Sequence, residues 1–125
     1  MKGIVVTPSD EICIADFGSP LYETVGKAVG GFIEIVHPIG LCPPYCMVVN
    51  DEGATIPLPE NRIGCILYAS YFHGVPICGN IVILKEGLTD DGPDFVPMEE
   101  KELQSMFSLL KGFELKPLEE KEILK

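Results

Sequence analysis

Positive charge is scarce in this sequence. The 125 residues include 9 lysines and arginines against 19 aspartates and glutamates, which gives a formal net charge of −10. Proteins that bind the nucleic-acid backbone or an anionic membrane need a basic surface, so we expect neither partner here. Arg62 is the only arginine. It alone could therefore hold a phosphate or carboxylate through two parallel hydrogen bonds.

Long apolar runs are also missing. No stretch approaches the ~20 apolar residues of a membrane-spanning helix. Met1-Lys2-Gly3 leads directly into a short strand-like segment, so we expect no secretory signal. The five cysteines are an odd number and lie among apolar residues, which favours reduced and mostly buried thiols. The sequence therefore predicts a cytoplasmic protein without disulfide bonds.

No recognisable metal-binding or catalytic pattern is present. His37, Cys42 and Cys46 are close in sequence, but a structural zinc site usually needs a second pair of ligands, and none follows. A cysteine nucleophile would need a histidine base, and the chain offers only His37 and His73. An uncharacterised Cys–His enzyme stays an alternative, but we expect no catalytic residues, no metal and no cofactor.

Loops that bind phosphate or calcium are not recognisable either. Gly30-Gly31 precedes a strand-like segment, whereas a phosphate-binding glycine loop precedes a helix. The acidic segment 89–94 lacks the spaced ligands and the closing glutamate of a calcium-binding EF-hand loop. We therefore interpret the first as the end of a helix and the second as a solvated loop.

The chain is rich in apolar residues, 46% of the total, and its length suits one domain. We predict a single α+β domain over 1–112, followed by a charged tail or short helix over 113–125. The expected fold is a mixed or mostly antiparallel sheet of about five strands with two helices packed against it. The periodicity predicts strands at 3–7, 11–16, 32–37, 46–50 and 80–84, and helices at 21–29 and 97–111. It also predicts an extended segment at 54–59 and a loop at 86–94. Residues 63–72 stay ambiguous between helix and strand.

Charge is distributed unevenly along the chain. Between Ile35 and Leu84 only four residues are charged. Either this segment holds almost the whole core, or part of it is an exposed patch that a partner or a second copy covers, because a domain of this size has a limited interior. The candidates for this patch are Tyr45, Ile66, Tyr68, Tyr71 and Phe72. The sequence therefore predicts a homo-oligomer.

The segment Leu58-Pro59-Glu60-Asn61-Arg62 is the best candidate for a binding site. Two prolines stiffen the backbone ahead of the only arginine. One interpretation is a surface ion pair of Arg62 with a nearby carboxylate, worth about 0–1 kcal/mol. The other is that Asn61 and Arg62 present hydrogen-bond donors at the rim of an apolar pocket.

The order of several motifs resembles a small family of domains of unknown function, the one numbered 3846. The motifs are Gly30-Gly31-Phe32-Ile33-Glu34, Asn50-Asp51-Glu52-Gly53, Pro59-Glu60-Asn61-Arg62 and the strand-like segment 79–84. The similarity covers roughly residues 1–111, and the sequence departs from the pattern at 38–45 and 68–73. The resemblance implies an accessory protein of bacteriophages and mobile elements, in a family with no established activity.

In that context we expect a non-enzymatic binding protein in the host cytoplasm that counters host defence. The leading hypothesis is sequestration of a nucleotide immune signal, in which Arg62 and Asn61 contact phosphate or ribose and Tyr45 and Tyr68 stack on a base. The alternative is an acidic inhibitor of a host defence protein. Its expected contact surface is Asp90, Asp91, Asp94, Glu99 and Glu100.

Overall fold

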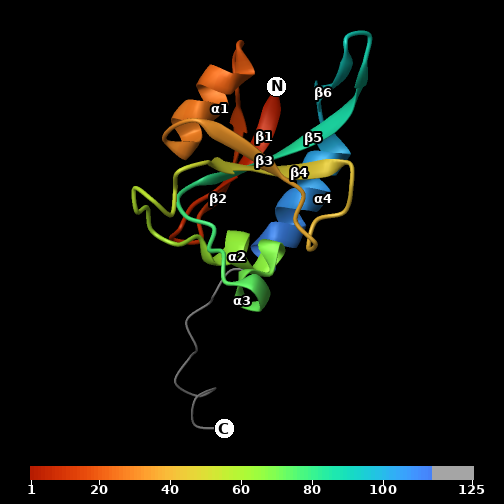
Figure 1. The fold of residues 1–125 in the computed structure, drawn as a ribbon. Helices are drawn as coiled ribbons and strands as arrows, with labels where there is room; N and C mark the ends of the chain where they lie inside the picture. The colour runs from red at the N-terminus through yellow and green to blue at the C-terminus, as the bar shows by residue number, and fades with distance from the viewer. Residues whose placement is uncertain (114–125) are drawn as a thin grey trace, which may run out of the picture.

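The computed structural model describes residues 1–113, with the side chain of His73 excepted. Within these residues the chain forms six strands and four helices, and Figure 1 shows the helices arranged around one sheet. The elements are β1 (Lys2–Val6), β2 (Ile12–Asp16), α1 (Leu21–Val29), β3 (Ile33–Val36), β4 (Tyr45–Asn50), α2 (Arg62–Tyr68), α3 (Ser70–His73), β5 (Ile81–Thr89), β6 (Gly92–Val96) and α4 (Glu100–Lys111). The expected tail at 113–125 lies, beyond Phe113, outside the described residues. No helix within 1–113 is long and apolar enough to pass through a membrane.

The sheet has six strands, and every pairing is antiparallel. The order is β2-β1-β5-β4-β3, and β6 pairs with the far end of the long strand β5. β5 is therefore the central strand, and its first half, Ile81 to Leu84, is completely buried. β3 lies at one end of the order, where it pairs only with β4 among the described residues.

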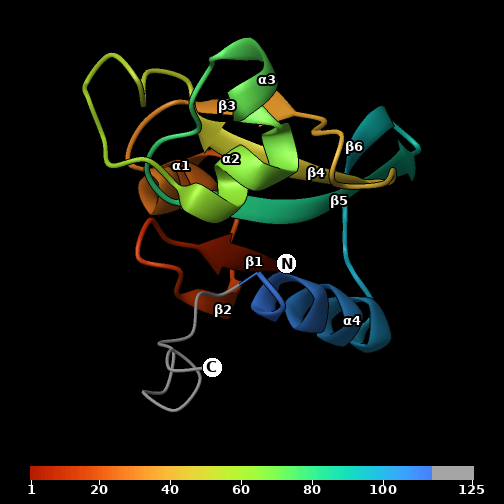
Figure 2. The same cartoon turned by 90° about the horizontal axis from the view of Figure 1, so that it is seen from below.

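Helices cover the two faces of the sheet unequally. α1 lies alone on one face, whereas α2, α3 and α4 lie on the other (Figure 1). Seen from below, α2 and α3 cover the half of the sheet that contains β3 and β4, and α4 lies beside β1 and β2 (Figure 2). The larger apolar cluster joins the sheet to α2 and α4, and a smaller one joins it to α1. Two cores therefore stabilise one sheet.

The predicted fold class is confirmed: the protein is α+β with an antiparallel sheet. The number of helices was wrong, because residues 62–73 form α2 and α3 and raise the described helices from two to four. In α2, Ile63 and Leu67 are buried one helical turn apart, whereas Ile66 is exposed. In α3, Tyr71 and Phe72 are exposed as well. Apolar residues on both sides hide the helical period.

Two other local expectations were wrong. The expected loop 86–94 is mostly a hairpin, in which β5 runs on to Thr89, the chain turns at Asp90 and Asp91, and β6 follows. The expected extended segment 54–59 begins with consecutive turns, and only Glu60 then forms an isolated β-bridge with Cys78. In 86–94, turn residues and a proline are compatible with an edge strand, which the sequence does not reveal. In 54–59, prolines that favour extended backbone are also compatible with a compact loop.

Candidate ligand-binding site

Asn61 sits at the beginning of α2 and is 0% exposed. Its side-chain oxygen accepts a hydrogen bond from the Gly64 N–H at 2.9 Å and caps the helix. Its Nδ2 donates to the carbonyls of Val6 and Gly79, each at 2.9 Å. Both donors and the acceptor are thus used inside the protein. The expectation that Asn61 presents a donor at a pocket rim is corrected, because this side chain joins α2 to β1 and to the segment before β5.

Arg62, the next residue, forms the ion pair that the sequence allowed. Its Nε and Nη2 donate to Asp10 Oδ2 at 3.0 and 2.7 Å, and Nη2 also donates to the carbonyl of Phe113. The guanidinium is therefore held between two segments far apart in sequence. Among the described residues, Nη1 has no hydrogen-bond partner. One edge of the only arginine remains available to a ligand.

A pocket of about 570 Å³ opens beside this arginine, and we call it the α2–α3 pocket. Its lining residues are Glu60, Arg62, Cys65, Ile66, Ser70, Tyr71, Gly74 and Pro76. Its volume lies in the range that small-molecule sites occupy. The wall is largely apolar, with a few polar groups from the beginning of α2 and of α3.

The hydroxyl of Ser70 is the most unusual group in this pocket. Ser70 is 8% exposed, and its Oγ is buried without a hydrogen-bond partner in the part of the chain that the structure describes. Leaving a buried polar group unpaired costs roughly 1–3 kcal/mol, so native proteins rarely do it. A ligand group that bonds to Oγ would remove this cost.

Tyr71 provides an exposed aromatic surface at the same pocket. Its side chain is 77% exposed, and its ring centroid lies 4.5 Å from that of Phe72. Sequence reasoning placed both residues on an exposed patch but assigned neither to a ligand. Nothing in the sequence distinguished Ser70, because its importance comes only from its burial in the folded chain.

Tyr45 lies elsewhere in the structure. Its hydroxyl donates to Glu102 Oε2 at 2.6 Å, and Lys85 donates to Glu102 Oε1 at 2.9 Å. The bond to Glu102 raises the pKa of Tyr45 to about 12. The same bond, together with bonds from the Glu99 N–H and Lys85, lowers the pKa of Glu102 to about 2. This network connects β4 and β5 to the first turn of α4.

Tyr68 is also separated from Arg62. It packs half-buried against the larger core and lines a small cavity of about 120 Å³ with Asn50 and Cys78. Tyr45 lines a different cavity of about 320 Å³ with His37 and Glu86. The four residues proposed from the sequence therefore do not form one site, and only Arg62 lines the α2–α3 pocket.

Cys46 and Cys78 are buried cysteines. Burial raises the pKa of the Cys46 thiol to about 12 and also raises that of Cys78. Such thiols stay protonated at neutral pH and are poor nucleophiles. The ring of His37 contacts Glu86 rather than a sulfur. No group of three metal-ligating side chains occurs within the described part of the chain.

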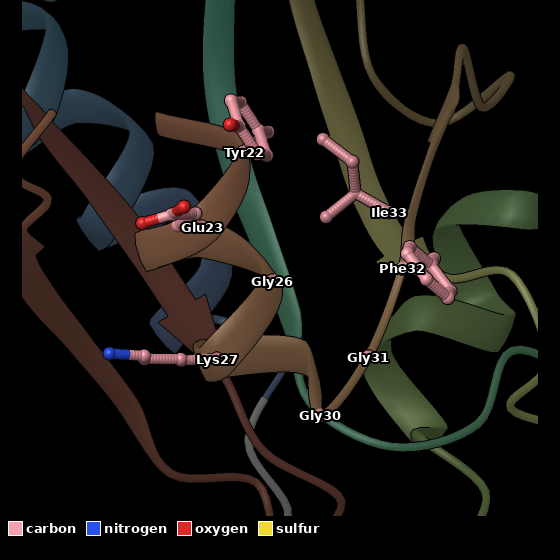
Figure 3. Close-up of a pocket in the computed structure, with 8 residues that line it drawn as sticks. All are labelled: Tyr22, Glu23, Gly26, Lys27, Gly30, Gly31, Phe32 and Ile33. Atoms are coloured by element: carbon pink, nitrogen blue, oxygen red, sulfur yellow. The ribbon is translucent and has the colours of Figure 1, made fainter. Parts of the chain in front are cut away.

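A second hollow of about 590 Å³, the α1–β3 groove, lies on the other face of the sheet. Figure 3 shows its lining residues: Tyr22, Glu23, Gly26, Lys27, Gly30, Gly31, Phe32 and Ile33. Tyr22 and Ile33 lie on the side between α1 and β3, whereas Glu23 and Lys27 project from the opposite side of α1 (Figure 3). The groove therefore offers mainly apolar contacts.

The glycines of this groove are required by the fold. Gly30 ends α1 in the left-handed conformation, with φ of 87°. A Cβ on Gly31 would lie 2.9 Å from Nδ2 of Asn50. That amide donates to the Val29 carbonyl, and its oxygen accepts from the Glu52 N–H. The motifs around residues 30 and 50 therefore meet in space and have a structural explanation.

The model of a family described as Domain of unknown function (DUF3846) matches residues 1–111. No curated protein and no solved structure matches the chain.

Proposed function

The chain belongs to the family described as Domain of unknown function (DUF3846), and on that premise we propose that it is a non-enzymatic binding protein for a small nucleotide-type ligand held in the α2–α3 pocket. One observation supports this most directly. The pocket combines an arginine edge, an unpaired buried hydroxyl and an exposed aromatic ring, contributed by Arg62, Ser70 and Tyr71.

Each of these groups suits one part of a nucleotide. Guanidinium N–H groups donate strong hydrogen bonds to phosphate oxygens. The hydroxyl of Ser70 can donate to a phosphate or accept from a sugar hydroxyl. Stacking of a base on an aromatic ring such as Tyr71 is worth roughly 1–3 kcal/mol. The apolar wall supplied by Ile66 and Pro76 would exclude water from the base.

The charges around the pocket limit the kind of ligand. Asp10 already neutralises most of the charge of Arg62 through an ion pair, and Glu60 adds a negative charge at the rim. A triphosphate would meet net repulsion here. A ligand whose phosphates each carry a single negative charge suits the site better. Examples are a singly ionised monophosphate and a cyclic phosphodiester.

The proposed biological role takes up what the resemblance implies, an accessory protein of phages and mobile elements. In the cytoplasm of a host, a protein that binds a nucleotide immune signal without consuming it would lower the free concentration of that signal. We propose sequestration as that role. It requires the protein at a concentration comparable to that of the signal and an affinity tight enough to retain it.

Self-association is a further part of this proposal. β3 pairs only with β4 among the described residues, and Phe32, 79% exposed, lies beside it at the α1–β3 groove. An antiparallel pairing of β3 with β3 of a second copy would continue the sheet across the two molecules. If the symmetry axis of this pairing passes between Glu34 and Ile35, Glu34 of each copy lies opposite Ile35 of the other. The two glutamates then do not face each other.

The direct test is native mass spectrometry of the purified protein with a mixture of cyclic dinucleotides, nucleoside monophosphates and ADP-ribose derivatives. We expect a ligand adduct of defined mass. The double variant Asp10→Asn/Arg62→Gln replaces the ion pair by a neutral pair, and asparagine tolerates the positive φ of 66° at position 10. It should weaken the adduct by about tenfold through loss of one charge-assisted hydrogen bond.

The control for this test is Lys27→Gln, which removes a cation from α1, on the other face of the sheet, and should leave the adduct unchanged. The proposal would be wrong if no nucleotide forms an adduct, or if the Asp10→Asn/Arg62→Gln variant binds as the wild type does while its melting temperature shows that it is folded.

One observation also favours the acidic protein-directed inhibitor as a second candidate. Asp90, Asp91 and Asp94 lie exposed at the tip and on the second strand of the β5–β6 hairpin, and Glu99 and Glu100 lie exposed at the beginning of α4. Such a surface would bind a basic protein in a strongly salt-dependent manner. Reversal of the three aspartates to lysine should abolish capture of such a target, and capture at undiminished strength would exclude this candidate.

A further inference from the structure

Glu60 is the one acidic side chain among the residues that line the α2–α3 pocket. Its carboxylate makes no hydrogen bond or ion pair with any residue that the structure describes. The backbone around it is fixed, however: Glu60 forms a β-bridge with Cys78, the Gly79 N–H donates to the Pro59 carbonyl at 2.7 Å, and the Asn61 N–H donates to the Ile77 carbonyl at 2.7 Å. A fixed backbone thus presents an unpaired acceptor at the pocket.

A carboxylate beside a base-sized pocket distinguishes the bases by their donors. The Watson–Crick edge of guanine carries two neighbouring donors, N1–H and the N2 amino group, which one carboxylate accepts side by side. Adenine and cytosine offer an amino group next to a ring nitrogen that carries a lone pair, and uracil offers one N–H between two carbonyls. Those lone pairs would repel the carboxylate. Guanine is therefore the only common base that fully satisfies Glu60.

We infer that the α2–α3 pocket selects guanine nucleotides, with Glu60 reading the Watson–Crick edge of the base. The inference rests on the proposed function and adds the identity of the base to it. Stacking on Tyr71 holds any base, and Arg62 with Ser70 holds any phosphate, so these three residues supply affinity without selectivity. Glu60 supplies the selectivity. It also explains why a site for an anionic ligand contains a carboxylate at all.

Isothermal titration calorimetry with guanosine, inosine and adenosine 5′-monophosphates tests this inference. Inosine lacks the N2 amino group and offers the carboxylate one donor. Adenosine offers an amino group next to a ring nitrogen whose lone pair repels the carboxylate. We expect guanosine monophosphate to bind at least about tenfold more tightly than adenosine monophosphate, with inosine monophosphate between them, since a hydrogen bond to a charged group contributes this much.

The variant Glu60→Gln should abolish the preference for guanine and leave the affinity for adenosine monophosphate equal or higher, because a negative charge near the phosphate is removed. Glu52→Gln removes an exposed glutamate outside the pocket and should change nothing. Both positions are exposed, so both variants should melt at the temperature of the wild type.

The outcomes separate the two proposals. Equal binding of the three monophosphates, or a guanine preference that persists in Glu60→Gln, overturns the inference while the proposed function stands. Equal binding together with a strong loss on removal of the ribose 2′-hydroxyl would show that Glu60 reads the sugar instead, and this also overturns it. Absence of binding by every nucleotide overturns both.

Discussion

The α1–β3 groove and the α2–α3 pocket have nearly the same volume, about 590 and 570 Å³, and lie on opposite faces of the sheet. Their chemistry differs. The groove is lined in part by glycines, because the end of α1 needs a left-handed residue and the side chain of Asn50 leaves no room for a larger one. The two charged side chains of the groove, Glu23 and Lys27, project away from the side between α1 and β3. Among the residues that the structure describes, the pocket retains a hydroxyl, a carboxylate and an arginine edge without hydrogen-bond partners. Two hollows of nearly equal volume therefore differ in the polar groups that line them.

The largest expected effect concerns Asn61, which caps α2, the helix that carries Arg62 and Ile66 of the pocket. Asn61→Ala removes the helix cap on the Gly64 N–H and the two buried bonds to the carbonyls of Val6 and Gly79. We expect a loss of at least about 3 kcal/mol in the free energy of unfolding, measured by urea denaturation. Asn80→Ala, which removes one partly buried bond to the Ala28 carbonyl, should cost about 1 kcal/mol. Equal costs would show that Asn61 is not central to the fold.

The second effect has the opposite sign. Ser70→Ala removes a buried hydroxyl that has no partner within the described part of the chain, so the unliganded protein should become more stable by about 1 kcal/mol. The same change should weaken nucleotide binding, because the ligand loses its bond to Oγ. Thermal melting with and without nucleotide measures both. A variant less stable than the wild type in the absence of ligand would show that Ser70 Oγ has a partner in solution.

The Tyr45–Glu102–Lys85 network should affect stability at both extremes of pH. The pKa of Glu102 falls from 4.5 to about 2 on folding, so its stabilisation is complete above pH 4.5 and is lost as pH falls toward 2. The pKa of Tyr45 rises from 10.0 to about 12, so its stabilisation is complete below pH 10 and is lost as pH rises toward 12.

Denaturation across pH tests this assignment of Tyr45 to the fold rather than to a ligand site. Glu102→Gln should flatten the decline in the free energy of unfolding between pH 4.5 and 2, and Tyr45→Phe should flatten the decline between pH 10 and 12. Tyr45→Phe should leave nucleotide affinity unchanged. A large loss of affinity in this variant would return Tyr45 to the binding site.

The smallest effect on stability is expected in the groove. Phe32 is exposed, so Phe32→Glu should change the free energy of unfolding by less than about 0.5 kcal/mol. It should nevertheless shift the proposed homo-oligomer toward monomer, because a charge would enter an apolar contact. Analytical ultracentrifugation measures this shift. An oligomer that survives the change does not use the α1–β3 groove.

The parts of the fold that local sequence signals determine were predicted well. Gly30 ends α1 because a left-handed residue stops a helix. The β-branched run at 3–7 and the alternating segment at 11–16 form β1 and β2. The stretch 63–72 stayed ambiguous because apolar residues lie on both sides of α2 and α3. β6 was missed because Gly92, Pro93 and Asp94 are typical of turns, although an edge strand with one partner tolerates them.

The candidate site was only partly predictable. The sequence singled out Arg62 because it is the only arginine, and that residue does line a pocket. The burial of Asn61 depends on the carbonyls of Val6 and Gly79, and the pairing of Arg62 depends on Asp10. These contacts join segments far apart in sequence, so no local pattern reports them. Ser70 becomes notable only when its surroundings are known.

The most direct test of the account compares guanosine monophosphate binding, by calorimetry, in Tyr71→Ala and Tyr22→Ala. Both changes remove an exposed tyrosine, one from the α2–α3 pocket and one from the α1–β3 groove. The account predicts about a tenfold loss of affinity for Tyr71→Ala through lost stacking and no loss for Tyr22→Ala. A loss confined to Tyr22→Ala would place the ligand in the groove and contradict the account.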